Sequence, residues 1–278
     1  MLTRLTERRV GKAWGRSALP EPFRGGAEGK RIGEILFEHP SGGHPDLLVK
    51  YLFTAQNSSI QVHPNDQTAR AAGHDHGKDE AWITLSAEPG AVIGSGLREA
   101  MTRDDLRAAA LDGSIAGLID WRPAAAGEIY YSPAGTIHAL GPGLVLLEIQ
   151  QNADVTYRLY DYGRDRPLHR AEGVEAAELA GTVARERPEL QHEGRETLSA
   201  RGVFVLERWR GLRSARLDPG GSGPIWLIPL QGAAFVGGET LEPGSVWMAE
   251  GPSTISQDPD GQLIAAYCGG AIRPGLLG

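Results

Sequence analysis

Alternating apolar and polar positions run through the first half of the chain and predict β-strands. Several short runs are rich in β-branched or aromatic residues and are bounded by Gly, Pro, Asn or Asp, as is typical of strands joined by tight turns. These runs cover residues 35–38, 47–53, 58–63, 81–86, 128–132, 144–151 and 155–160. The pattern predicts a large all-β unit.

One segment has the spacing of a helix instead. Its apolar positions are Leu106, Ala109, Ala110 and Leu111. Thr102 precedes them as a candidate N-cap, Asp104 favours the positive end of a helix, and Gly113 stands where the helix would end. We expect a short helical insertion near residues 102–120.

Strand signals fade after residue 165 and return near residue 202. Residues 166–200 are charged and predict a connector, with a short helix at 173–180. Later strand-like runs cover 203–208, 225–229, 233–236, 245–248 and 263–268. The expected organisation is a first domain at 1–165, a connector at 166–200 and a smaller β-rich domain at 201–278.

Composition narrows the class of protein. The 278 residues are 41% hydrophobic and carry a net charge of −7, so we expect a globular core and no general attraction for nucleic acid. No apolar run approaches the roughly 18 residues of a membrane span, and the amino terminus lacks the apolar stretch of a signal peptide. Cys268 is the single cysteine, which excludes a disulfide framework. We expect a cytoplasmic protein without a membrane partner.

Lysine is rare in this sequence. The 28 basic residues include four lysines, Lys12, Lys30, Lys50 and Lys78. Where arginine is the default cation, a retained lysine suggests a position that needs a compact ammonium group.

The string from Gly127 to His138 is the most specific in the chain. It predicts a strand, a turn formed by Pro133-Ala-Gly135, and a second strand that carries His138. The turn fixes the geometry, so His138 points to a defined place.

Two other strings carry metal-ligand chemistry. On one strand Ser59, Gln61 and His63 share a face, because side chains alternate along a strand. At the start of the next strand Lys78 and Glu80 share a face, and Glu80 can supply a negative ligand.

A competing pattern is present nearby. His74-x-His76 followed by Glu80 also has the form of a metal-binding motif. Glycines flank this pair, which indicates a loop, and ligands are better fixed on strands. We therefore favour Gln61 and His63 as ligands.

Arg158 lies in a strand of alternating apolar residues, where an unpaired charge is costly. Two interpretations stay open. Arg158 pairs with Asp161 or Glu148 as a structural group, or it points into a site that needs a fixed cation.

Taken in order, these motifs resemble the type I mannose-6-phosphate isomerases of the shorter bacterial form, members of the cupin superfamily. The resemblance also includes Lys12-Ala-Trp14-Gly15 and Arg31-Ile-Gly-Glu34, and it covers roughly residues 10–165. It implies an all-β fold, a cupin-type jelly-roll β-barrel followed by a second, smaller β-rich domain. It also implies a metal-dependent aldose–ketose isomerase that interconverts mannose 6-phosphate and fructose 6-phosphate through a cis-enediol.

The resemblance implies a role for each matching residue. The zinc ligands fall on Gln61, His63, Glu80 and His138, with one Zn²⁺ per chain and other divalent metals as alternatives. The catalytic residues fall on Arg158, Lys78 and Glu148. The substrate-binding residues fall on Ser59, Lys50 and Arg164.

Two rival functions are considered beside the isomerase. A cupin dioxygenase would favour the ligands His74 and His76, and a sugar-phosphate-binding protein would keep the pocket without turnover. The isomerase and the sugar-phosphate-binding protein would both have a small-molecule sugar phosphate as their partner. The sequence does not fix the oligomeric state.

Overall fold

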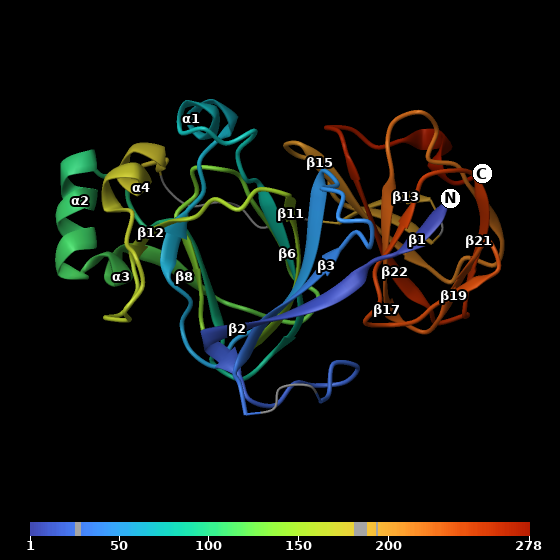
Figure 1. Cartoon of the computed structure of the whole chain (residues 1–278), viewed down its shortest axis with the longest axis horizontal. Coiled ribbons are helices and arrows are strands. Elements are labelled where there is room, and N and C mark those ends of the chain that lie inside the picture. The colour runs from blue at the N-terminus through green and yellow to red at the C-terminus, as the bar shows by residue number, and fades with distance from the viewer. Residues whose placement is uncertain (26–28, 181–187, 193) are drawn as a thin grey trace.

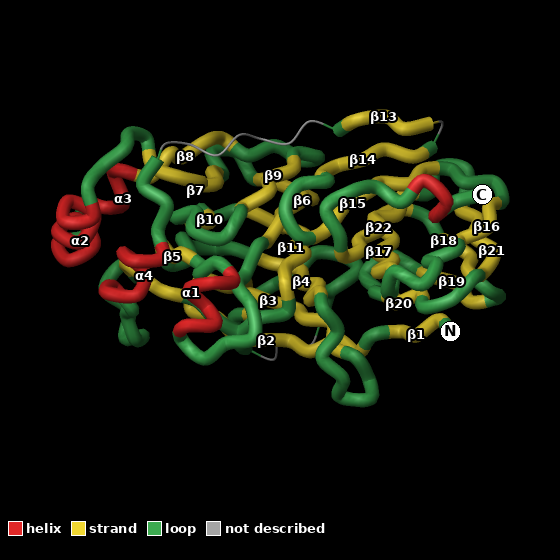
Figure 2. Tube along the Cα trace, turned by 90° about the horizontal axis from the view of Figure 1, so that it is seen from above, coloured by secondary structure: helices red, strands yellow, loops and turns green. Residues whose placement is uncertain are grey.

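The computed structural model describes residues 1–25, 29–180, 188–192 and 194–278, and most elements in these ranges are β-strands (Figure 1). The strands form four antiparallel sheets, two in each half of an elongated molecule (Figure 2). One half holds a six-stranded and a five-stranded sheet, and the other holds a seven-stranded and a four-stranded sheet. No described helix combines the length and the apolar character needed to cross a membrane.

The first half contains every strand that the alternation predicts there. The six-stranded sheet consists, in spatial order, of β2 (Thr6–Arg16), β3 (Ile32–Glu38), β4 (Leu47–Phe53), β11 (Leu144–Gln151), β6 (Glu80–Ala87) and β9 (Ile129–Ser132). The five-stranded sheet consists of β12 (Tyr157–Tyr160), β5 (Ile60–Val62), β10 (His138–Leu140), β7 (Val92–Leu97) and β8 (Ile119–Pro123).

Side chains alternate between the two faces of each strand in this half. In the six-stranded sheet one face packs against the other half of the molecule, and the opposite face points to the space between the two sheets. On β11, Leu147 and Ile149 pack into the core shared with the other half, whereas Leu146 and Glu148 face the space between the two sheets. An apolar cluster fills part of that space. The remainder is a cavity of about 760 Å³.

Helices cover the outer face of the five-stranded sheet (Figure 1). They are α2 (Arg103–Asp112), α3 (Ile115–Leu118) and α4 (Arg170–Ala176), and their apolar residues pack against Ile60 and Val62 of β5. The predicted helix is confirmed: Thr102 and Asp105 form a reciprocal capping box, and Gly113 ends α2 in the left-handed conformation, with φ of 87°. A further helix, α1 (Asp66–Ala71), was not predicted.

The second half is a sandwich with its own core. Its larger sheet consists of β1 (Leu2–Arg4), β20 (Trp247–Ala249), β17 (Ile225–Gln231), β22 (Gln262–Cys268), β15 (Phe204–Arg210), β14 (Arg195–Ser199) and β13 (Glu189–His192). Its smaller sheet consists of β16 (Ala215–Leu217), β21 (Ser253–Gln257), β18 (Ala234–Val236) and β19 (Glu239–Leu241). A short 3₁₀ turn, Pro274–Leu276, lies near the end of the chain.

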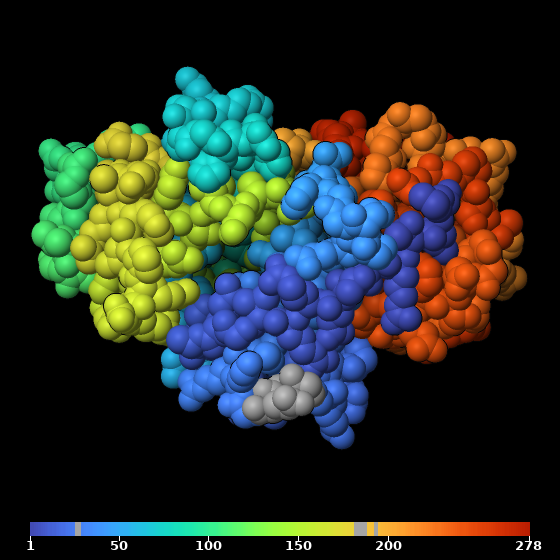
Figure 3. Space-filling view, in the orientation of Figure 1, coloured from blue at the N-terminus to red at the C-terminus, as the bar shows by residue number. Residues whose placement is uncertain are grey.

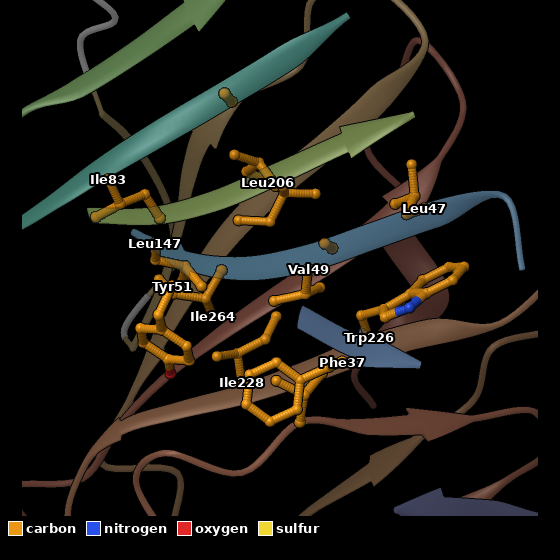
Figure 4. Close-up of a cluster of buried hydrophobic side chains, with 14 of the residues drawn as sticks. Phe37, Leu47, Val49, Tyr51, Ile83, Leu147, Leu206, Trp226, Ile228 and Ile264 are labelled. Atoms are coloured by element: carbon orange, nitrogen blue, oxygen red, sulfur yellow. The ribbon is translucent and has the colours of Figure 1, made fainter. Parts of the chain in front are cut away.

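The two halves share one hydrophobic core. Phe37, Val49 and Leu147 of the six-stranded sheet meet Leu206 and Ile228 of the seven-stranded sheet (Figure 4). The amino-terminal strand β1 pairs with β20, so the first residues of the chain belong to the second half.

The predicted connector differs from the structure in one respect. Residues 166–200 were expected to lack strands, but β13 and β14 lie there and join the seven-stranded sheet. Arg195 explains the error, because this charged residue is buried and pairs with Glu207 across the sheet. The predicted helix at 173–180 appears as α4, which begins and ends earlier, and residues 181–187 lie outside the described residues. The division into domains remains a prediction.

Candidate metal centre

Strands from both sheets of the first half bring the predicted site residues to one cavity. Gln61 on β5 lies between His138 on β10 and Arg158 on β12, because it pairs with both. In the other sheet, Lys50 on β4 pairs with Glu148 on β11. All five residues line the cavity. It opens as a hollow between the N-terminal strands in blue and the yellow-green segment that leads into β12 (Figure 3).

His63, Glu80 and His138 form a compact group with the chemistry of a metal site. Their candidate ligand atoms all lie within 4.8 Å of one another. Oε1 of Glu80 lies 3.0 Å from Nε2 of His138, and Oε2 lies 3.3 Å from Nε2 of His63. Each of the three residues is at most 2% exposed. Two imidazoles and one carboxylate suit Zn²⁺ and other divalent transition metals.

Hydrogen bonds on the far side of each imidazole fix its ligand atom. Nδ1 of His63 donates to the carbonyl of Val155 at 2.8 Å, and Nδ1 of His138 donates to the carbonyl of Thr136 at 3.0 Å. With Nδ1 protonated, the lone pair of each Nε2 points toward Glu80. Burial and the charge of Lys78 lower the pKa of His63 to about 3, so this imidazole stays neutral at physiological pH.

Glu80 is a buried carboxylate that the protein alone does not satisfy. Neither of its oxygens accepts a hydrogen bond from the described residues. Burial raises the pKa of Glu80, but the adjacent ammonium of Lys78 opposes this effect, and the pKa lies well below its usual range. An anion without hydrogen bonds, facing two lone pairs, fits a bound cation. The residues present therefore fit a divalent metal.

The amide of Gln61 touches the same group. Its Nε2 lies 3.1 Å from Nε2 of His138, and its Oε1 accepts a hydrogen bond from Oγ of Ser59 at 2.9 Å. Turning the amide about its last side-chain bond exchanges oxygen and nitrogen and presents the oxygen to the group. Gln61 thus lies beside the metal group, and the hydroxyl of Ser59 can bond its amide in either orientation, because a hydroxyl both donates and accepts hydrogen bonds.

Glu148 and Lys50 belong to a second buried network beside the metal group. Nζ of Lys50 lies 3.1 Å from Oε1 of Glu148, and it also donates to Oε1 of Gln150. Nε1 of Trp82 donates to Oε2 of Glu148 at 2.9 Å, and the ring of Trp82 packs against His138 with centroids 5.2 Å apart. Burial lowers the pKa of Lys50, but the carboxylates of Glu148 and Glu34 outweigh it and raise the pKa above its usual range. Lys50 is therefore a fixed cation.

The two predicted catalytic cations differ in their surroundings. Lys78 contacts the metal group directly, with Nζ 3.2 Å from Oε2 of Glu80 and 3.3 Å from Nε2 of His63. The guanidinium of Arg158 makes no hydrogen bond or ion pair to the rest of the described chain, and its Nε is buried without a partner. The structural pairing with Asp161 or Glu148 considered above is thus not formed, and Arg158 is a fixed cation at the cavity wall.

Arg164, the third predicted substrate-binding residue, does not line the cavity. Its guanidinium donates to Oδ1 of Asp161 at 2.9 Å and to the carbonyl of Asn57 at 2.7 Å. The competing histidines, His74 and His76, also lie outside the cavity and outside the three-residue metal group.

Several charged residues of the cavity received no role from the sequence reasoning. Lys12 and Glu34 form an ion pair at 3.0 Å on the wall made by β2 and β3, and Arg166 lies in the loop after β12. The scarcity of lysine was a usable signal, because Lys12, Lys50 and Lys78 all line the cavity. No such signal distinguishes Arg166 among the many arginines.

Comparisons with known proteins point in one direction. No protein-family model matches the sequence. The chain is 32% identical to a mannose-6-phosphate isomerase of Streptococcus mutans over 286 residues, 93% of this chain and 88% of that protein. It is 35% identical to a mannose-6-phosphate isomerase of Bacillus subtilis over 66% of this chain and 61% of that protein. The crystal structure of the mannose 6-phosphate isomerase from Bacillus subtilis superposes with a TM-score of 0.83 at 26% identity, covering 96% of this chain and 99% of that chain.

Proposed function

The chain belongs to the mannose-6-phosphate isomerase family, and we propose that it interconverts mannose 6-phosphate and fructose 6-phosphate with a bound divalent metal. The observation that carries this proposal is the group of His63, Glu80 and His138, because Glu80 and His138 line the same cavity as the unpaired Arg158. The reaction moves a proton between C2 and C1 of the open-chain sugar through a cis-enediol. Negative charge develops on the sugar oxygens, so the site has to supply cations.

We propose Zn²⁺ as the metal, held by Gln61, His63, Glu80 and His138. With a single carboxylate among its ligands, a divalent ion bound here would keep net positive charge and would supply Lewis acidity for a sugar oxygen. The same donor set also accepts other divalent transition metals.

Three residues of this chain are proposed to act on the reacting carbons. Arg158 donates hydrogen bonds to the oxygen that becomes charged, and one fixed donor of this kind contributes roughly 2.7–4 kcal/mol to the transition state. Lys78 and Glu148 are the two candidates for holding and moving the proton. Trp82 and Lys50 hold Glu148 in place.

Lys50 and Ser59 are proposed to bind the substrate, since both line the cavity. Arg164 supports this part of the site indirectly, through Asp161 and the backbone of Asn57. We place the reaction in the cytoplasm: the single cysteine fits a reducing compartment. The two rival functions are not favoured, because identity to an isomerase extends over most of both chains.

A coupled assay tests the proposal. We expect purified protein to convert mannose 6-phosphate to fructose 6-phosphate, to lose activity on chelation together with its metal, and to recover when Zn²⁺ is returned. Metal content is measured on the same samples. Sugar phosphate that raises the melting temperature without conversion would favour the binding-protein alternative, and oxygen uptake without isomerisation would favour the dioxygenase.

A further inference from the structure

Most cations of the cavity wall are already neutralised by a carboxylate. Lys12 pairs with Glu34 at 3.0 Å, and Lys50 pairs with Glu148 at 3.1 Å. Lys78 pairs with Glu80 at 3.2 Å. Each of these pairs has no formal net charge, so a dianionic phosphate group gains little from the walls that they form.

The wall beside β12 is different. Arg158 has no carboxylate partner among the described residues, and Asp161 is shared by two arginines, Arg164 and Arg166. The cluster sets three arginines against Asp161, and Asp154, which also lines the cavity, reduces the excess on this wall to one positive charge. Arg158 and Arg166 both line the cavity, and burial together with the charge of Arg166 lowers the pKa of Arg158. An anion bound between them would relieve their repulsion.

A tight loop brings Arg166 to this position. After β12 the chain turns through Tyr162 and Gly163, which both have positive φ, at 53° and 75°. It returns so that the backbone N–H of His169 donates to the carbonyl of Arg158 at 2.8 Å. The loop therefore closes next to Arg158, and Arg166 lines the cavity with it.

The hydrogen bonds of Arg166 leave part of its guanidinium free for a ligand. Nε donates to Oδ2 of Asp161 and Nη2 donates to Oδ1, both at 2.6 Å, in a bidentate pair. Asp161 is 2% exposed, so it is a rigid anchor. An arginine has five N–H donors, and three remain after this pair. Arg164 also makes two hydrogen bonds, to Asp161 and to the carbonyl of Asn57, but unlike Arg166 it does not line the cavity.

We propose that Arg166, anchored by Asp161, is the residue that binds the phosphate group of the substrate, next to Arg158. This inference rests on the proposed function and makes it more specific. It assigns the phosphate to Arg166, a residue outside the substrate-binding set Lys50, Ser59 and Arg164 that the resemblance implies. Lys50 and Ser59, nearer the metal group, contact the sugar oxygens.

Kinetics and phosphate binding test the inference. We expect Arg166→Ala to raise KM for mannose 6-phosphate by about 10- to 100-fold, the effect of losing one charge-assisted hydrogen bond. The kcat should change less than KM, because a phosphate contact holds the substrate and the transition state alike. Binding of inorganic phosphate to the holoenzyme, measured by calorimetry, should weaken by a similar factor. Arg166→Lys should recover part of the affinity, and Arg216→Ala, an exposed arginine of the second half, is the matched control.

Arg164→Ala is the competing variant, and it should raise KM less than Arg166→Ala. The inference is overturned if KM of Arg166→Ala stays within twofold of the unaltered enzyme, or if Arg164→Ala has the larger effect. If Arg166→Ala fails to fold, Arg166→Lys and Arg166→Gln carry the same comparison. An unaltered protein that binds phosphate through Arg166 but does not isomerise would contradict the proposed function and leave this inference standing.

Discussion

The most deeply buried glutamates among the described residues of the two halves are Glu80 and Glu207, and they have opposite surroundings. Glu207 in the second half is 0% exposed and accepts hydrogen bonds from both Nε and Nη2 of Arg195, from Nε1 of Trp209 and from the hydroxyl of Tyr267. Glu80 in the first half is 1% exposed, and neither of its oxygens accepts a hydrogen bond from the described chain.

This difference separates a structural carboxylate from a functional one. A buried charge is costly unless it is paired and hydrogen-bonded, and Glu207 meets that requirement within the protein. Glu80 meets this requirement only in part, because it is paired with the charge of Lys78 but accepts no hydrogen bond. The lone pairs of two imidazoles face its carboxylate. The arrangement around Glu80 is stabilised by a cation, whereas the arrangement around Glu207 is complete.

The largest expected effect comes from removing the charge of Glu80. Glu80→Gln should lower kcat by about 1,000-fold or more, because a metal that contributes several kcal/mol to the transition state is lost or weakened. Metal content should fall in parallel, and the metal-free protein should lose less stability than Glu207→Gln does, because Glu80 accepts no hydrogen bond from the described chain. Metal content and activity close to those of the unaltered protein would show that Glu80 is not a ligand.

Glu207→Gln should have the opposite profile. Breaking a buried ion pair by removing one partner costs about 3–5 kcal/mol, here because Arg195 is left without its carboxylate. Urea unfolding should show this loss of stability, while the metal content per folded molecule should stay unchanged. A Glu207→Gln variant that is as stable as the unaltered protein but binds no metal would show that Glu207 serves the metal site and not the stability of the fold.

Lowering the pH should reduce the free energy of unfolding of the metal-free protein, through His63 in the first half. The pKa of His63 is lowered to about 3 in the folded state, whereas an unfolded histidine has a pKa near 6.5. Between these values the unfolded state binds a proton that the folded state does not, so stability is lost as pH falls below 6.5. The loss attributable to His63 should be about 2 kcal/mol between pH 7 and pH 5.

Urea unfolding of the chelated protein at the two pH values measures this effect. The free energy of unfolding should fall less between the two pH values in His63→Gln, which has no imidazole to titrate at this position. An equal fall in both proteins would assign the acid sensitivity to other groups.

Local signals predicted much of the fold. The capping residues Thr102 and Gly113 directly precede and follow α2 in the sequence, so they were recognisable without a structure. The alternation of residues along β4 and β11 was equally visible, because it repeats every two residues. The pairing of β1 with β20 could not be foreseen, because the two strands are almost the whole chain apart.

The charged strands of the second half were hidden for a related reason. The segment that contains Arg195 is rich in charged residues, which is typical of the surface. Arg195 can be buried only because it pairs with Glu207, which lies on another strand. The same limit applied to the site. Residues on strands with a recognisable motif, such as Gln61 and His138, were identified, whereas Arg166 depends on a turn that brings it back to Arg158.

The location of the bound metal tests the central claim most directly. Anomalous scattering from a crystal of the zinc-loaded protein, collected on both sides of the zinc absorption edge, locates the ion without assumptions about its ligands. The account predicts one strong peak per chain, within coordination distance of Nε2 of His63, Nε2 of His138 and a carboxylate oxygen of Glu80. A peak at His74 and His76, or no peak in the cavity of an active, zinc-containing sample, would contradict it.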